Sequence, residues 1–215
     1  MTKIRTASQL NDLMDAEFAW RKKELHEVKA IVWRNQGSHL QAVSVRSALA
    51  MLYAHWEGFV KQIGSAYLEF VSRQGISHSQ LSDCFLALAI RPLLKSAAAS
   101  NQAEDHIKMV SFFRKEMSSK SQIFHVSAIN TQSNLTSTVF RNIIVMLGLD
   151  FSPYITKVKL IDEQLVKNRN SIAHGEYLLV DVDEYIAIHD EIVSLMQLFF
   201  NQISNASTLN LYRIA

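Results

Sequence analysis

The sequence predicts an all-α fold, an irregular bundle of six or seven helices within a single domain. The chain has 215 residues but only six glycines and two prolines. Because turn formers are so scarce, long helices are favoured over many short strands. The apolar fraction of 48% and the charged fraction of 20% are typical of a globular protein that buries a core. Apolar residues recur at helical spacing between the few breaks.

Start and stop signals divide the chain into its predicted helices. These helices span residues 8–33, 39–74, 79–90, 102–117, 135–147, 153–174 and 184–204. Ser8 or Asn11 is expected to cap the first helix, since their side chains can accept from free N–H groups. Gly75 is expected to end the second helix, where a left-handed residue is needed.

The middle of the chain contains shorter elements. The third helix begins after Ser79 or Ser82, and Pro92 is expected to kink or break it. Asn101 is predicted to cap the fourth helix. Residues 118–131 are polar and predict a loop, which could include a short strand over residues 123–126.

The last three helices carry the clearest signals. Ser133 or Asn134 is predicted to cap the fifth helix, and Pro153 to stand in the first turn of the sixth. Gly175 should end the sixth helix. Asp181 or Asp183 should cap the last one, followed by a loose or docked tail. We expect one domain over residues 1–215, with 1–37 forming an accessory helix on a core of about 40–205.

Composition limits the classes of function. The net charge of +2 permits contact with nucleic acid but does not require it, so RNA binding would need a local basic patch. A single cysteine, Cys84, excludes an internal disulfide and argues against a structural zinc site. The longest apolar run, residues 84–90, is too short to cross a bilayer. We expect a cytoplasmic protein with no membrane contact, no metal and no cofactor.

The run from Lys167 to Glu176 is the most informative stretch. Arg169 can hold a phosphate by a planar two-point contact, and His174 can move a proton near neutral pH. Asn170 adds a carboxamide beside them. These groups suffice for cutting a phosphodiester in RNA, where the 2′-hydroxyl is a built-in nucleophile.

Arginine followed five residues later by histidine is a weak signal, because the chain contains four such pairs. The other three pairs are Arg21/His26, Arg34/His39 and Arg73/His78. The first is interpreted as a solvated helix face, and the other two span predicted turns. Only the late pair lies at a helix end between an apolar stripe and a glycine.

Helical geometry constrains the late pair. Five residues rotate by about 140° in an α-helix, so Arg169 and His174 do not point the same way. Asn170 and His174 are four apart and share a face. This favours a site formed where two chains meet, with both copies of the motif facing one groove.

Three segments together resemble a known family. Arg169, Asn170 and His174, in an all-α domain, match the signature of the HEPN superfamily (higher eukaryotes and prokaryotes nucleotide-binding). Residues 52–61 (LYAHWEGFVK) and Asn134-Leu135 are similar to the bacterial HEPN subfamily named for two Microcystis proteins and grouped with RiboL-PSP-HEPN domains. The resemblance covers about residues 40–205.

This resemblance implies a metal-independent endoribonuclease that forms a homodimer and acts as a toxin of a toxin–antitoxin system or as an antiviral effector. The implied products are a 2′,3′-cyclic phosphate and a 5′-hydroxyl. His174 would act as general base or acid, Arg169 would stabilise the pentavalent phosphate, and Asn170 would position phosphate or His174. An antitoxin or regulatory protein is a possible partner. The alternative is a non-catalytic helical module that binds a partner protein or a nucleotide.

Several residues near the motif have two interpretations. Glu57 and Lys61 are four apart and predict an ion pair, or else they support the motif. Trp56 is assigned to the core, whereas Tyr53 is equally suited to core or to substrate contact. Arg46 follows the same helix. Lys167, with Lys157 and Lys159, could form the basic strip that RNA needs, or an ordinary solvated face. The acidic residues around Glu184 are interpreted as capping groups rather than as a metal site.

Overall fold

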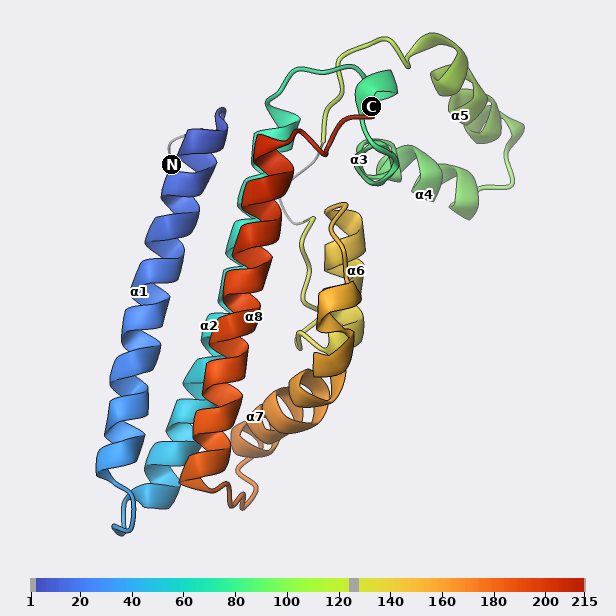
Figure 1. The fold of residues 1–215 in the computed structure, drawn as a ribbon. Helices are drawn as coiled ribbons and strands as arrows, with labels where there is room; N and C mark the ends of the chain where they lie inside the picture. The colour runs from blue at the N-terminus through green and yellow to red at the C-terminus, as the bar shows by residue number, and fades with distance from the viewer. Residues whose placement is uncertain (1–2, 124–127, 215) are drawn as a thin grey trace.

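The protein is described by a computed structural model covering residues 3–123 and 128–214. All of its regular elements are helical, as predicted (Figure 1). The long helices are α1 (Ala7–Arg34), α2 (Gln41–Ser72) and α8 (Val182–Thr208). The shorter α-helices are α3 (Asp83–Ala89), α4 (Arg91–Ala99), α5 (Ala103–Lys115), α6 (Ser137–Met146) and α7 (Lys167–Ala173). Single turns and short segments are η1 (His78–Gln80), η2 (Ser152–Lys157) and the π-helical η3 (Leu160–Val166).

Helices α1, α2 and α8 lie side by side and form the main body of the bundle (Figure 1). Helix α2 is at its centre and contributes fully buried residues on several faces, among them Leu49, Trp56 and Ile63. Trp56 packs edge-on against Phe140 at 4.9 Å between ring centroids, which confirms its assignment to the core. Helix α7 packs against the same central helix.

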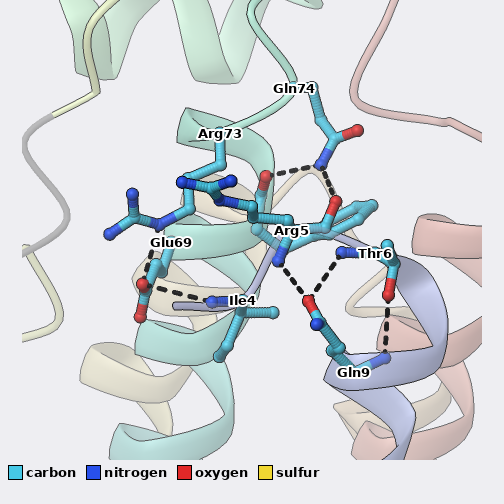
Figure 2. Close-up of polar contacts among 8 residues, drawn as sticks. Ile4, Arg5, Thr6, Gln9, Glu69, Arg73 and Gln74 are labelled. Atoms are coloured by element: carbon cyan, nitrogen blue, oxygen red, sulfur yellow. Dashed lines mark hydrogen bonds and ion pairs between the residues drawn. The ribbon is translucent and has the colours of Figure 1, made fainter. Parts of the chain in front are cut away.

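The N-terminus of α1 is tied to the far end of α2. Thr6, rather than Ser8 or Asn11, caps α1: the Gln9 N–H donates to Thr6 Oγ1, and Gln9 Oε1 accepts from the Thr6 N–H (Figure 2). Gln74 Nε2 donates to the carbonyl of Arg5, and Glu69 Oε1 accepts from Arg73 Nε at 2.8 Å (Figure 2). The sequence pattern missed this cap because the nearby Ser8 and Asn11 can cap a helix equally well in isolation.

Other boundaries follow the prediction with local differences. The expected break at Pro92 is present: α3 ends at Ala89, and Pro92 stands in the first turn of a separate helix, α4, beyond the predicted third helix. Gln102 and not Asn101 precedes α5, and it makes no side-chain cap. Thr136 caps α6 in place of Ser133 or Asn134, because its Oγ1 accepts from the Val139 N–H. The suggested strand over residues 123–126 falls mostly outside the described residues.

The start of α8 and the C-terminal tail agree with the sequence prediction. Asp181 caps α8 by accepting from the Val182 N–H. The C-terminal tail is docked rather than loose: Tyr212 is buried, and its carbonyl accepts from the Ser82 N–H at 2.9 Å.

Arg21 contradicts the solvated-face interpretation of its helix. It is 9% exposed, pairs with Glu17 and stacks on Trp20. Gly58 makes room for it, since a Cβ there would lie 3.1 Å from Arg21 Nη1. A cation on α1 is therefore accommodated against a glycine of α2.

We predict that Gly148→Ala destabilises the protein more than Gly37→Ala. Both glycines have positive φ, where alanine costs about 1–2 kcal/mol. A Cβ at Gly148 would also lie 2.8 Å from Cys84 Sγ, whereas one at Gly37 meets nothing within 4 Å. Urea denaturation of both variants measures the difference. Equal losses would show that the Cys84 contact costs nothing.

Stability should fall as the pH drops below about 6.5. Burial lowers the pKa of His55 and of His189, with Glu24 and Asp190 only partly opposing it. Below this pH, the two histidines bind protons in the unfolded chain but not in the folded chain. The free energy of unfolding therefore decreases on acidification. Denaturation of wild type and His55→Gln at about pH 7.5 and about pH 5.5 tests this. The variant should depend less on pH, and exposed His106→Gln serves as the control.

Candidate active site on helix α7

The Arg169–His174 run occupies α7 and its C-terminal end. The Gly175 N–H donates to the Ile172 carbonyl and the Glu176 N–H to the Ser171 carbonyl, the paired pattern that a left-handed glycine allows. Gly175 thus ends the helix as predicted. His174 stands at the last position of the turn and is exposed.

Arg169 is half-buried and turned toward α2. Its Nη1 donates to Asn134 Oδ1 and to Asn170 Oδ1, both at 2.8 Å. The guanidinium carbon lies 4.6 Å from the centroid of the Tyr53 ring. These partners are all uncharged, and none of the ion pairs among residues 3–123 and 128–214 includes Arg169. The side chain is held in place while its positive charge stays unpaired.

The remaining donors of Arg169 are available. Neither Nη2 nor Nε makes a hydrogen bond within the described chain, and neither is among its buried polar atoms that lack a partner. Both nitrogens therefore retain some contact with solvent. Two adjacent free donors are what a bidentate contact with a phosphate requires.

Tyr53 connects Arg169 to the loop before α6. Its hydroxyl accepts from the Leu135 N–H at 2.7 Å. Burial raises the pKa of Tyr53 to about 12, and the charge of Glu57 adds to this, while Leu135 and Arg169 oppose it. Tyr53 is therefore a neutral phenol near pH 7, with its ring face toward the guanidinium. This arrangement is a cation–π contact supported by a backbone hydrogen bond.

Asn134 is a residue of the site whose role the sequence did not indicate. It was interpreted as a helix cap, but it holds Arg169 instead. The two residues before it, Gln132 and Ser133, have φ of 51° and 73°, a conformation that side chains disfavour. This strained turn brings Asn134 and Leu135 to the Arg169–Tyr53 pair.

The structure brings together only some of the predicted residues. Arg169, Asn170 and Tyr53 are in direct contact, and Glu57 lies near the Tyr53 hydroxyl. The predicted Glu57–Lys61 ion pair is wrong: no such pair occurs among the described residues, and Lys61 is exposed.

The predicted cations around the motif are dispersed. Lys167 is exposed at the first position of α7, and Arg46 is half-buried on α2 without a hydrogen bond in the described chain. Lys157 is engaged with Glu191 of α8 at 2.7 Å, which weakens the proposed basic strip on this segment.

Two buried histidines have acidic partners. His55 Nε2 lies 2.8 Å from Glu24 Oε2, and His189 Nδ1 lies 2.8 Å from Asp190 Oδ1. His125 lies outside the described residues. Across residues 3–123 and 128–214 no cluster of three or more His, Cys, Asp or Glu side chains could hold a metal ion. No helix in this part of the chain is both long and apolar enough to cross a membrane.

An all-α bundle with an arginine, a neighbouring asparagine and a histidine at the end of a late helix defines a HEPN-type protein. The model of the MAE_28990-like HEPN family matches residues 10–212, and the chain belongs to this family. The match includes most of α1 and extends beyond residues 40–205 at both ends. Comparisons with curated proteins and with solved structures gave no match.

We predict that Tyr53→Phe destabilises the protein by about 1–3 kcal/mol. The ring remains, but the buried Leu135 N–H loses its acceptor, and an unpaired buried donor carries this cost. Denaturant unfolding measures the change. Tyr177→Phe is the matched control, because that hydroxyl is on a side chain 80% exposed. Similar stabilities of the two variants would contradict the assigned role of the Tyr53 hydroxyl.

Proposed function

We propose that the protein is a metal-independent endoribonuclease of HEPN type that cuts RNA by attack of the 2′-hydroxyl on the adjacent phosphate. The proton of the 2′-hydroxyl passes to a histidine acting as base. The 5′-oxygen leaves with a proton from a histidine acting as acid. The products are a 2′,3′-cyclic phosphate and a 5′-hydroxyl, and neither step needs a metal ion.

The observation that carries this proposal is the unpaired charge of Arg169. A guanidinium fixed by two carboxamides and an aromatic face is preorganised for an anion without being neutralised. Charge accumulates on the phosphate oxygens in the pentavalent transition state. The free Nη2 and Nε donors are suited to meet those oxygens, with Asn170 fixing the other end of the fork.

One chain supplies one His174, whereas the reaction uses a base and an acid. We infer a homodimer in which His174 of each subunit faces a common groove, so that the two imidazoles divide the roles. The α1–α2 and α7–α8 connections lie at the same end of the bundle (Figure 1). Tyr177 and Leu179, just after His174, are 80% and 70% exposed. Apolar side chains so exposed beside the motif support a contact with a second copy.

Arg46 and Lys167 near this end, together with Lys61 further along α2, would hold the RNA backbone. Arg46 and Tyr53 are seven residues apart on α2 and share a face, so Arg46 is placed toward the connection end. Lys167 lies two residues before Arg169. We propose that Arg46, Lys167 and Lys61 contact phosphates next to the one that is cut.

A biological role follows from this activity. An RNase free in the cytoplasm harms its own cell, so we propose a toxin or anti-phage effector that an antitoxin or regulatory protein restrains. The second candidate is a non-catalytic module that binds a partner or nucleotide through the same surface. It is favoured by one observation: no polar contact joins Arg169 to His174 within the described residues of one chain.

We expect the purified protein to cut RNA in the presence of EDTA, leaving 2′,3′-cyclic phosphate ends. His174→Ala should abolish cleavage, because no other group at this position can transfer the proton. Arg169→Lys should lower the rate by about 100-fold or more, since lysine keeps the charge but lacks the planar fork. Labelled RNA and end-group analysis measure both.

The control is His106→Ala, which removes an exposed histidine on α5. It should cut as wild type does. Unchanged cleavage in His174→Ala would exclude the proposed mechanism. Saturable RNA binding that weakens in Arg169→Lys, without cleavage by wild type, would instead establish the binding module.

A further inference from the structure

Helix α1 presents an unpartnered flank. It packs on α2 and α8, and a strip of its surface next to the α8 contact stays exposed. Asp12, Asp15, Ala19, Lys22 and His26 are exposed along it. Their spacing of three, four, three and four residues keeps them on one side of the helix, as in the seam of a coiled coil. This set of residues is called the α1 seam below.

The α1 seam is acidic in its first half and basic in its second. Asp12, Asp15 and Lys22 take part in no ion pair within the described chain. Other charges of α1 are engaged: Glu17 with Arg21, and Lys29 with Asp190 of α8. Asp12, Asp15 and Lys22 are therefore free to pair with another chain, and the two signs occur in separate parts of the seam.

A groove runs beside the seam between α1 and α8. Its volume is about 770 Å³, and its lining includes Ala19, Lys22, His26 and Val193. Ala16 and Ala19 are both exposed, and their short side chains protrude little from the middle of this helix face. Small residues at the centre of a helix face let a second helix approach closely.

We propose that this flank binds α1 of a second copy of the chain, antiparallel, about a two-fold axis near Ala19. Antiparallel pairing about residue 19 places Asp12 opposite His26 of the partner subunit. It places Asp15 opposite Lys22 and Lys23 of the partner subunit. Each contact occurs twice by symmetry, so both acidic blocks meet both basic blocks.

The charge order selects this occupant. An RNA strand lying along the seam would place its phosphates against Asp12 and Asp15, and these like charges would repel each other. A parallel helix pair would set like charges opposite one another, which is unfavourable. In the antiparallel pair of identical helices, Asp15 of each subunit lies near Lys22 and Lys23 of the partner subunit, so opposite charges meet on both sides of the axis.

This contact differs from the proposed motif-facing dimer. Helix α7 lies on the other side of the bundle from α1 (Figure 1). The α1 contact therefore leaves the motif end free, and the two interfaces together would assemble four chains. The inference does not depend on RNA cleavage.

The test uses charge reversal, read as the molar mass in solution by light scattering at low salt. Lys22→Glu/Lys23→Glu and Asp12→Lys/Asp15→Lys should each reduce the assembly to half of the wild-type mass. An equimolar mixture of these two variants should recover the wild-type mass, because one seam is then wholly acidic and the other wholly basic. The variant with all four substitutions should also recover it.

Arg114→Glu/Lys115→Glu is the matched control, because it reverses two adjacent exposed cations on α5. It should keep the wild-type mass. All the substituted side chains are exposed, so circular dichroism should show intact folding. High salt should dissociate the wild-type contact by screening its charges.

Three results would overturn the inference. Wild type could be a single chain at every concentration, both two-site variants could keep its mass, or the mixture could fail to recover it. Loss of RNA cleavage in Arg169→Lys with the α1 contact intact, or the reverse, separates this inference from the proposed function.

Discussion

Helix α2 must be covered on nearly every side, and this requirement arranges the rest of the protein. Its buried residues occupy more than one face, so α1, α8 and the α7 segment all have to pack against it. Tyr53 lies on one of these covered faces of α2, and its buried hydroxyl needs a hydrogen-bond partner. The Leu135 N–H supplies it, which ties the loop before α6 to the central helix. The ring face that remains is occupied by Arg169.

The partners of Arg169 distinguish it from Arg21 and Arg73, the arginines of two look-alike pairs. Arg21 and Arg73 begin pairs with the same spacing, yet each is engaged by a carboxylate one turn away, Glu17 and Glu69. Those ions contribute to packing and have little charge left to attract a ligand. The hydrogen-bond partners and the ring partner of Arg169 are neutral instead. Spacing alone could not separate these arginines, because the distinction lies in what packs against each of them.

The sequence predicted the helices well because their apolar periodicity is local. It predicted several caps poorly, since Thr6 and Thr136 were competing with neighbouring polar residues that cap equally well in isolation. The role of Asn134 could not be predicted from the sequence, because it depends on α7 packing beside a loop thirty-five residues earlier in the chain. The π-helical segment η3 was likewise not foreseen, because its side-chain contacts are long-range.

The π-helical segment has a consequence for the orientation of α7. Asp162, within it, accepts from both the backbone N–H and the hydroxyl of Ser137 at the start of α6. A π turn holds more residues than an α turn, so it rotates whatever follows relative to a continuous α-helix. Arg169 follows three residues after the segment ends and is turned inward onto Tyr53. Since α7 itself is α-helical, that same rotation sends His174 outward. The π-helical segment thus precedes a helix on which the guanidinium faces the central helix and the imidazole faces solvent.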